Sequence, residues 1–212
     1  PATRCPSLLR SPAAAGRLMR IVHLPAHEYR RERWRNERGW TREIHRHPEG
    51  SAQWQWRASI AEIDQDAPFS AFPGCDRELV LLAGGGMRLN FDDGETVTLN
   101  PPHERIRFSG ERPLSAELVD GPTHDFNLIW RRDAVQVTVL HRPLVGAMVF
   151  FAEPGTTWLI HLMQGQAHFK DLARPLRLEL GDSALLLPDA DGPSRRIIDG
   201  GGELLLAKIS PV

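Results

Sequence analysis

The chain has few cysteines and few lysines, and each shortage narrows what it can be. Its 212 residues include two cysteines, Cys5 and Cys75, whose spacing matches no metal or redox motif. We therefore expect no disulfide framework and a reducing, cytoplasmic environment. Only Lys170 and Lys208 are lysines among 26 basic residues. Nearly all positive charge is carried by arginine, whose planar guanidinium suits carboxylate recognition.

Net charge and long apolar runs are also lacking. Lys plus Arg is 26 and Asp plus Glu is 27, so the formal charge is −1. This balance gives no electrostatic footprint for nucleic acid or an anionic membrane. No apolar run reaches the roughly 18–20 residues needed to cross a bilayer. The composition, 41% hydrophobic and 25% charged, is that of a globular protein with one large or two small domains.

Residues 1–18 differ from the rest of the chain. They contain three prolines, an Ala-rich patch, and arginines without any acidic residue. They lack the apolar core of about 7–15 residues that a signal peptide needs. Because a structured pattern begins at Met19, we expect residues 1–18 to be a mobile N-terminal extension.

From Met19 onward the chain is rich in short alternating or apolar runs. Turn residues separate these runs at 84–86, 92–94, 100–102 and 120–122. Strands at this spacing predict an all-β sandwich or barrel. The segment "HEYRRERW" is the best candidate for a short helix or an irregular entry segment.

A second series of strands begins near Ala147 and echoes the first. "ELVLLAGGGMRL" is matched by "WLIHLMQGQAHF", and "ETVTLNPPHERIRF" is matched by "LRLELGDSALLLPD". The echo predicts two related β-barrels in tandem. Residues 19–140 form the first, which carries the pocket, and residues 141–212 form a second, smaller barrel packed on it. The alternative is one larger sandwich with accidental echoes. Small apolar-lined barrels often hold ligands in their mouths.

The motif "HRH" invites a metal interpretation. Gly39, His45 and His47 match the opening of a metal-binding cupin site, in which a glutamate follows. That position is Ser51 or Ala52 here, and neither ligates as a carboxylate does. Because a stable site needs a third or fourth ligand, we predict no metal and no other cofactor.

Strand alternation places other polar side chains together. Residues i and i+2 of a strand lie roughly 6.5–7 Å apart on one face, so such a pair can address one small ligand. The pairs that share a face are Thr41 with Glu43, Arg57 with Ser59, and Asp125 with Asn127. The polar faces of exposed sheets show the same pattern, so periodicity alone leaves both interpretations open.

The turn "FSAFPGCDREL" favours a pocket. It combines Phe69 and Phe72 with a rigid Pro73–Gly74 corner, and Arg77 follows. Aromatic side chains around a few fixed polar groups are typical of small-molecule sites.

Four segments together carry a family resemblance. "RWRNERGWTREI", "QWRASIAEIDQDAPFSAFPGCDREL", "LLAGGGMRL" and "RFSGERPLSAELVDGPTHDFNLIWRR" resemble the HutD/Ves family. The resemblance runs from about Met19 to Arg132, and more loosely to the C-terminus. It implies a cupin-like double β-barrel (bicupin) with few short helices and without the usual cupin metal ligands. It also implies a link to bacterial histidine utilisation, with control of that pathway through binding of N-formylglutamate. Ves members are linked to a cold or stress response.

The family's motif positions give the candidate ligand-binding residues. They are Asn36, Thr41, Arg42, Glu43, Arg57, Ser59, Phe69, Phe72, Arg77, Asp125 and Asn127. The chain departs from the family at Glu37 and Arg38, where the family has glycines. If those glycines provide a positive φ or a close approach to ligand, bulky side chains here narrow the pocket or change its preference.

The leading hypothesis is a non-catalytic regulator of histidine utilisation that binds a small acidic intermediate such as N-formylglutamate or urocanate. Arg57 and Arg77 grip a carboxylate, because a guanidinium presents a planar fork to two oxygens. Asn127, Thr41 and Ser59 fix the amide or formyl end. We expect no nucleic acid or membrane partner, and we consider a homodimer.

Three alternatives stay open. Asp125 is expected to orient an arginine, but each arginine has a structural alternative, an ion pair with Glu43, Asp76 or Glu78. An isomerase or hydrolase acting on a carboxylate metabolite would use Glu43 or Asp125 for acid–base chemistry, with a strongly raised pKa. The third alternative is a protein–protein regulator with a vestigial pocket.

Overall fold

The computed structural model describes residues 17–172, 174–188 and 192–212. These residues form strands joined by short connections, together with a 3-10 segment, η1 (Ala26–Glu28). The prediction of an all-β fold is confirmed. Within this part of the chain, no helical segment has the length and apolar character needed to span a membrane. Most of the predicted extension, residues 1–16, lies outside the described residues.

The first half of the molecule contains two sheets that face each other. The six-stranded sheet runs, in spatial order, β10 (Arg105–Ser109), β7 (Cys75–Ala83), β12 (Thr123–Arg131), β5 (Trp56–Ile63), β4 (Gly39–His47) and β3 (Arg30–Arg33). The four-stranded sheet runs β6 (Ala67–Pro68), β11 (Leu114–Leu118), β8 (Met87–Phe91) and β9 (Thr96–Leu99).

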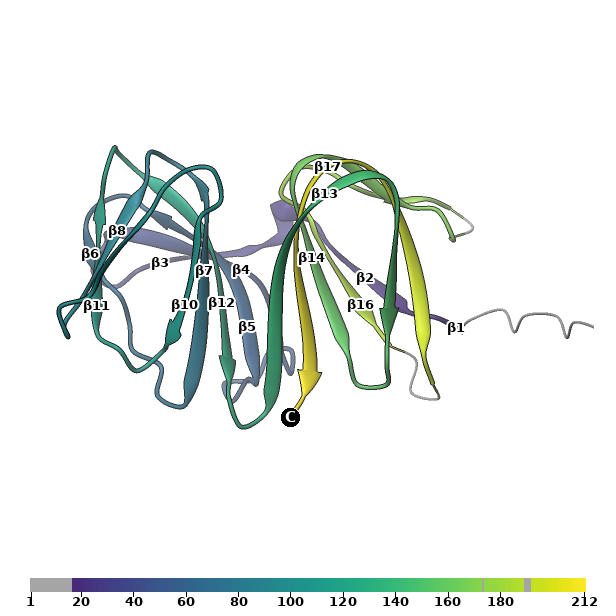
Figure 1. Ribbon diagram of the computed structural model, residues 1–212, viewed down its shortest axis with the longest axis horizontal. Helices are drawn as coiled ribbons and strands as arrows, with labels where there is room; N and C mark the ends of the chain where they lie inside the picture. Colours follow the sequence, from purple (N-terminus) through teal and green to yellow (C-terminus); the bar gives the residue numbers. More distant parts are fainter. Residues whose placement is uncertain (1–16, 173, 189–191) are drawn as a thin grey trace, which may run out of the picture.

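The second half is built from a seven-stranded sheet. Its order is β1 (Arg17–Leu18), β17 (Ser194–Pro211), β14 (Thr157–Phe169), β16 (Ser183–Leu187) and β2 (Arg20–Leu24). In addition, β13 (Val135–Ala152) pairs along β17, and β15 (Leu176–Leu178) pairs with β14. The long strands β13 and β17 arch over, so that the sheet bends back on itself (Figure 1).

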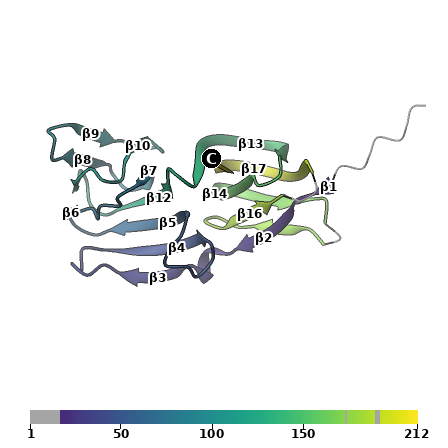
Figure 2. The ribbon, with the colours of Figure 1, turned by 90° about the horizontal axis from the view of Figure 1, so that it is seen from below.

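The chain crosses between the two halves twice, once from β2 to β3 and once from β12 to β13 (Figure 2). The N-terminal strand β2 pairs with β16, so it belongs to the second half. The sequence predicted a boundary between the two barrels at residues 140 and 141, with all earlier residues in the first. By strand pairing, residues 20–24 and 135–140 belong to the sheet of the second half. Sequence periodicity identifies strands but does not reveal their hydrogen-bonding partners.

The predicted internal echo has a counterpart in the strand order. Neighbouring strands β10, β7, β12 and β5 in the first half correspond to β16, β14, β17 and β13 in the second. Among the described strands, however, no sheet closes on itself. The two halves are therefore open rather than closed barrels.

Alternation on the central strands creates separate cores. On β12, Phe126, Leu128 and Trp130 lie in the apolar core between the two halves. Asp125 and Asn127 therefore point the other way, into the first half and toward the four-stranded sheet. A second core fills the first half and a third fills the second half. This arrangement buries both faces of the central strands β5, β12 and β7.

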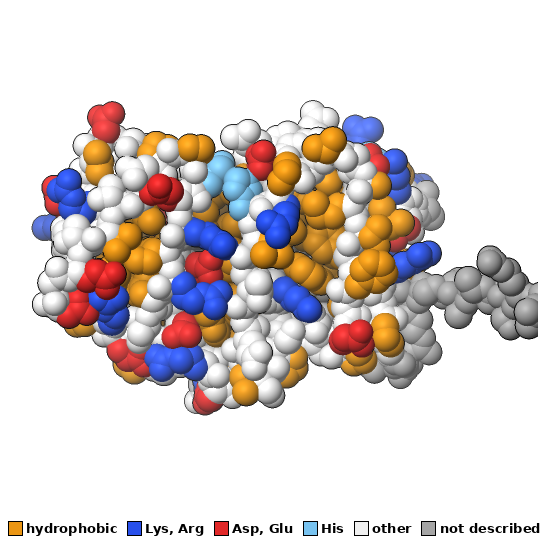
Figure 3. Space-filling model, in the orientation of Figure 1, with side chains coloured by type: hydrophobic (Ala, Val, Ile, Leu, Met, Phe, Trp, Pro, Cys, Tyr) orange, Lys and Arg blue, Asp and Glu red, His pale blue; other side chains and the backbone are white. Residues whose placement is uncertain are grey.

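Arginines of β10 join the two halves along one face. Glu78, which is 4% exposed, forms ion pairs with Arg105 at 3.1 Å and with Arg107 at 2.7 Å. The same guanidinium groups donate hydrogen bonds to the carbonyl oxygens of Val139 and Val137 on β13. Basic and acidic side chains accordingly alternate along the boundary between the halves (Figure 3).

Candidate functional site

Polar side chains gather on the inner face of the six-stranded sheet. Three successive rows across β5, β12 and β7 are Arg57–Ile129–Arg77, Ser59–Asn127–Leu79 and Ala61–Asp125–Leu81. The rows are roughly 6.5–7 Å apart along the strands. We call Arg57, Ser59, Arg77, Thr123, Asp125 and Asn127 the inner polar cluster. Its arginines lie at one end and its carboxyl group lies deeper.

The inner polar cluster is buried with few internal partners. Arg77 is 3% exposed, Asp125 is fully buried and Asn127 is 8% exposed. Within the described part of the chain, several buried atoms have no hydrogen-bond partner: Nε of Arg57 and of Arg77, Oγ1 of Thr123, both carboxyl oxygens of Asp125, and Oδ1 of Asn127. Burying such a group without a partner costs about 1–3 kcal/mol. The cluster is therefore incomplete without water or a ligand.

Arg77 is surrounded by rings rather than by acids. Its guanidinium carbon lies 5.0 Å from the ring centre of Phe69, 5.5 Å from that of Phe72 and 5.3 Å from that of Phe108. Its hydrogen bond to the Ser70 carbonyl oxygen, at 3.2 Å, leaves most of its donors free. An arginine held in place by the faces of aromatic rings keeps the N–H donors of its guanidinium group available for an anion.

The carboxylates that were candidates for ion pairs with Arg57 and Arg77 are paired with other arginines. They form ion pairs as follows: Glu43 with Arg46, Asp76 with Arg132, and Glu78 with Arg105 and Arg107. Among the described residues, neither Arg57 nor Arg77 forms an ion pair with a carboxylate. The ion-pair alternative for these two arginines therefore does not hold.

Burial shifts the ionisation of the cluster. It raises the pKa of Asp125 to about 7, against the opposing charge of Arg77. It also lowers the pKa of Arg77 to about 10, against the opposing charge of Asp125. Burial likewise lowers the pKa of Arg57. Near neutral pH Asp125 is therefore able to donate or to accept a hydrogen bond.

Thr41 and Glu43 lie on the same inner face, on the neighbouring strand β4. Thr41 pairs with Ala61, and Glu43 pairs with Ser59. The Oγ1 of Thr41 accepts a hydrogen bond from the indole nitrogen of Trp34 at 2.9 Å. The structure thus brings both residues beside the cluster, with Thr41 fixed by an aromatic neighbour.

Two candidate residues lie away from the cluster. Asn36 is exposed in the turn before β4, where its side-chain oxygen accepts a hydrogen bond from the backbone of Arg38. Arg42 points to the opposite face of β4, because it alternates with Thr41 and Glu43. Its guanidinium there donates to the Ala26 carbonyl oxygen at 2.7 Å.

The turn that departs from the family keeps a glycine-like backbone. Glu37 has a φ of 60°, the left-handed conformation that glycine adopts readily. Glu37 and Arg38 are both exposed. The adjoining Gly39 pairs with Ile63, at the opposite end of the sheet from Arg57. Their side chains therefore do not narrow the inner polar cluster.

Sequence reasoning missed other residues of the site. A register shift between Glu43 and His45 places Arg46 opposite Arg57, on the inner face. Simple alternation from Glu43 would turn Arg46 outward, so the bulge hid it. Thr123 is two residues before Asp125 and was detectable by alternation. Trp54, whose ring centre lies 5.5 Å from the Arg57 guanidinium, is on a loop and gave no periodic signal.

The histidines of "HRH" lie on the other face. His45 and His47 pack against Trp56, with ring centres 5.2 and 6.0 Å away. Within residues 17–172, 174–188 and 192–212, no three side chains of His, Cys, Asp or Glu gather as metal ligands. The two histidines therefore do not face the inner polar cluster.

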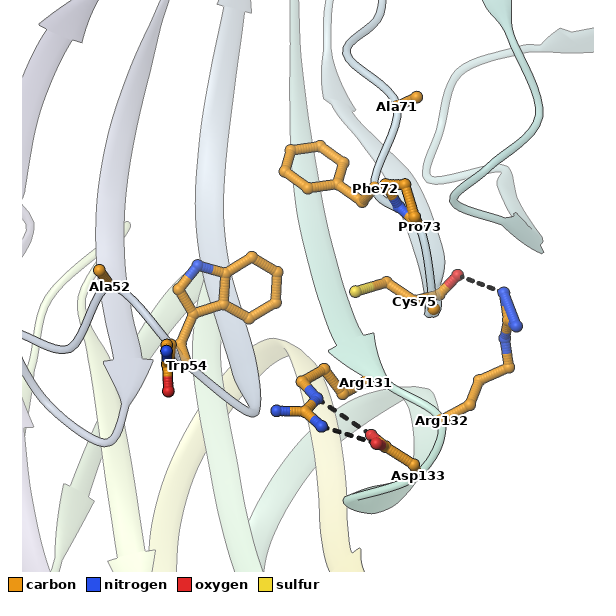
Figure 4. A pocket seen from close by; sticks show the side chains of 11 residues that line it. Ala52, Trp54, Ala71, Phe72, Pro73, Cys75, Arg131, Arg132 and Asp133 are labelled. Carbon is orange, nitrogen blue, oxygen red and sulfur yellow. Dashed lines mark hydrogen bonds and ion pairs between the residues drawn. The ribbon is translucent and has the colours of Figure 1, made fainter.

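A cleft of about 630 Å³ opens at the end of the first half where the arginines lie. Three connections form it, β4–β5, β6–β7 and β12–β13. Its lining residues are Ala52, Gln53, Trp54, Ala71, Phe72, Pro73, Gly74, Cys75, Arg131, Arg132 and Asp133 (Figure 4). Trp54 and Phe72 lie both on this cleft and against Arg57.

Comparison with known proteins identifies the class and then the family. The solved structure of a cupin 2 conserved barrel domain protein from Leptotrichia buccalis is 11% identical, with a TM-score of 0.54 over 81% of this chain and 88% of that chain. This likeness shows the fold alone, and the chain is a cupin-like all-β protein. A family model described as HutD matches residues 26–206, and the chain belongs to the HutD family.

Named relatives agree with this assignment. An uncharacterised 21.2 kDa protein in the region 3′ of hutC in Pseudomonas putida is 42% identical over 50% of this chain and 56% of its own length. Protein Ves of Cronobacter sakazakii is 42% identical over 50% of this chain and 58% of its own length. The chain thus spans little more than half the length of these curated relatives. HutD from Pseudomonas fluorescens SBW25 is 26% identical, with a TM-score of 0.78 over 91% of this chain and all (100%) of that chain.

Proposed function

We propose that the protein is a non-catalytic, small-molecule-binding regulator of histidine utilisation. Its inner polar cluster binds a small acidic intermediate of that pathway, such as N-formylglutamate or urocanate. Membership of the HutD family and relatives named for hutC and HutD support the pathway. In this proposal the protein acts in the cytoplasm, without nucleic acid or membrane, and light scattering decides between a monomer and a homodimer.

The observation that carries the proposal is the set of buried polar atoms without partners. Arg57 and Arg77 offer unpaired N–H groups at the end of the cluster nearest the cleft. Asn127 and Asp125 offer unpaired oxygens one and two rows deeper. A ligand that carries a carboxylate and a nearby N–H donor satisfies both ends. The arginines bind the carboxylate as charge-assisted donors, and the deeper oxygens accept from the N–H.

The second half of the molecule provides an internal comparison. The strands β14 and β17, which correspond to β7 and β12, carry Ile160, Leu162, Leu204 and Leu206 in the core of that half. Apolar side chains of this kind need no partner, and the buried Arg196 of that half forms an ion pair with Asp171 at 3.2 Å. The polar residues at the corresponding strands of the first half are therefore better explained by ligand binding than by folding.

Thermal unfolding of the full chain with each acid tests the proposal. A ligand at one hundred times its Kd adds about 2.7 kcal/mol to the unfolding free energy. For a protein of this length we expect the Tm to rise by about 5–10 °C. The variant Arg77→Met, which keeps side-chain length but removes the charge, loses the shift. The control Arg88→Gln, on an exposed ion pair with Glu117, retains it. No shift with N-formylglutamate, urocanate, histidine or glutamate would contradict the proposal.

One observation favours an enzyme as the second candidate function. Asp125 has a pKa of about 7, the range in which a carboxyl group serves as a general acid or base. Glu43, by contrast, is bound to Arg46. Chromatography of each acid after incubation with the protein would reveal turnover, and Asp125→Asn should abolish it. Binding without turnover favours the regulator.

A further inference from the structure

The cleft outside the inner polar cluster is large enough to hold part of a ligand. Its volume of about 630 Å³ falls within the usual range of small-molecule sites, roughly 300–1,000 Å³. Figure 4 shows the neighbouring rings of Trp54 and Phe72 in its upper part and the guanidinium of Arg131 below them. The lining is therefore aromatic at one end and cationic at the other.

The cleft adjoins the arginine end of the cluster. The Arg57 guanidinium carbon lies 5.5 Å from the ring centre of Trp54 and 5.5 Å from that of Phe72. The two ring centres are 6.2 Å apart. Trp54 and Phe72 thus border both the cleft and Arg57. A carboxylate bound at Arg57 therefore lies next to these rings.

The chemistry of the walls favours a flat, electron-rich group over a saturated one. Arg131 donates Nε and Nη2 to Asp133, at 3.0 and 2.6 Å, and its Nη1 has no partner among the described residues. A guanidinium held in this way presents its face to an aromatic ring. Trp54 and Phe72 also gain from edge or offset contacts with another ring, which a saturated group of the same size does not make.

We propose that this cleft is an outer subsite of the binding site, and that it holds an aromatic or heteroaromatic ring attached to the bound carboxylate. The inference rests on the proposed function, because it needs the carboxylate at Arg57 and Arg77. Trp54, Phe72 and Arg131 then determine specificity for the remainder of the ligand. Urocanate then places its ring, with the ring N–H, in the cleft and away from Asn127 and Asp125. N-formylglutamate has no ring and directs its amide N–H to those deeper oxygens, so the subsite separates the two acids.

The test compares two acids of similar size, 3-phenylpropionate and 3-cyclohexylpropionate, with propionate as the reference that lacks a ring. Their Kd values are measured by calorimetry with the full chain. A ring contact changes affinity by roughly 2- to 12-fold. We therefore expect 3-phenylpropionate to bind about tenfold more tightly than propionate. It should also bind more tightly than 3-cyclohexylpropionate, although the cyclohexyl group has more apolar surface.

Variants locate the effect. Trp54→Ala removes the preference for the phenyl acid over the cyclohexyl acid, whereas Trp54→Phe keeps part of it. Trp54 is half-buried on a loop, so neither change disturbs a core. Trp40→Ala is the matched control, because Trp40 contacts Arg31 and Arg33 instead of the cleft. That control should preserve the full preference.

The outcomes separate this inference from the function on which it rests. Equal or tighter binding of the cyclohexyl acid would overturn the outer subsite. So would a phenyl preference that survives Trp54→Ala, or a Trp54→Ala change that weakens all acids equally. The proposed function would stand in those cases, since Arg77→Met would still abolish binding of every acid. Failure of all three acids to bind the unaltered protein would also overturn the outer subsite. The proposed function would be overturned separately, if N-formylglutamate, urocanate, histidine and glutamate all leave the Tm unchanged.

Discussion

Asp125 should make the protein less stable as the pH rises from about 4 to about 7. Its folded-state pKa is about 7 and its ordinary value is 3.8, because burial disfavours the charged carboxylate. A group with a raised pKa in the folded state binds its proton more tightly there than in the unfolded chain. The carboxyl therefore adds stability at low pH, and this stability is lost between about pH 4 and pH 7.

The size of the effect follows from the shift. About three pKa units correspond to about 4 kcal/mol, at 1.36 kcal/mol for each unit. Because other groups also titrate in this range, the quantity to measure is the difference between the unaltered protein and Asp125→Asn. Urea unfolding at pH 4 and pH 8 gives this difference. We expect it to change by about 4 kcal/mol, with Asp125→Asn relatively more stable at pH 8.

An exposed carboxyl group, Asp93, provides a control for the direction in which stability changes with pH. Hydrogen bonds from Arg112 lower the pKa of Asp93, so its contribution is lost as the pH falls. Asp93→Asn should therefore change the pH dependence in the opposite direction. If the difference between the unaltered protein and Asp125→Asn is the same at pH 4 and pH 8, the account of Asp125 as a buried, destabilised carboxylate is refuted.

Three further predictions concern stability. Glu37→Gly should raise the unfolding free energy by about 0.5–1 kcal/mol in urea titrations, because glycine takes a positive φ without strain, and ligand affinity should not change. Phe126→Ala should lower it by about 3–5 kcal/mol, since Phe126 is 1% exposed in the core between the halves; a loss below 1 kcal/mol would contradict that packing. Tyr29→Phe should cost about 1–2 kcal/mol in calorimetric unfolding, because its hydroxyl binds Gly181 O and Ser183 Oγ; a neutral effect would show that these bonds contribute nothing.

The sequence by itself determined which side chains share a face. A strand alternates with a period of two, so Arg57 had to lie with Ser59, and Asp125 with Asn127, whatever the fold. The same rule separated Arg42 from Thr41. The family motifs added the fold class and the pathway, because they record an arrangement that has already been selected in relatives.

Only the tertiary structure decided which face is inside and which groups meet. The face of Asp125 is buried against the four-stranded sheet, whereas His45 and His47 pack on the other side, and alternation has no information on this choice. The arginines that pair with Asp76 and Glu78 come from strands and loops distant in the sequence. Glu43 pairs with Arg46 of its own strand, which the register shift brings to the same face. None of these carboxylates is left to pair with Arg57 or Arg77. A contact between distant residues depends on how the sheets stack. Local periodicity reports only the geometry within one strand.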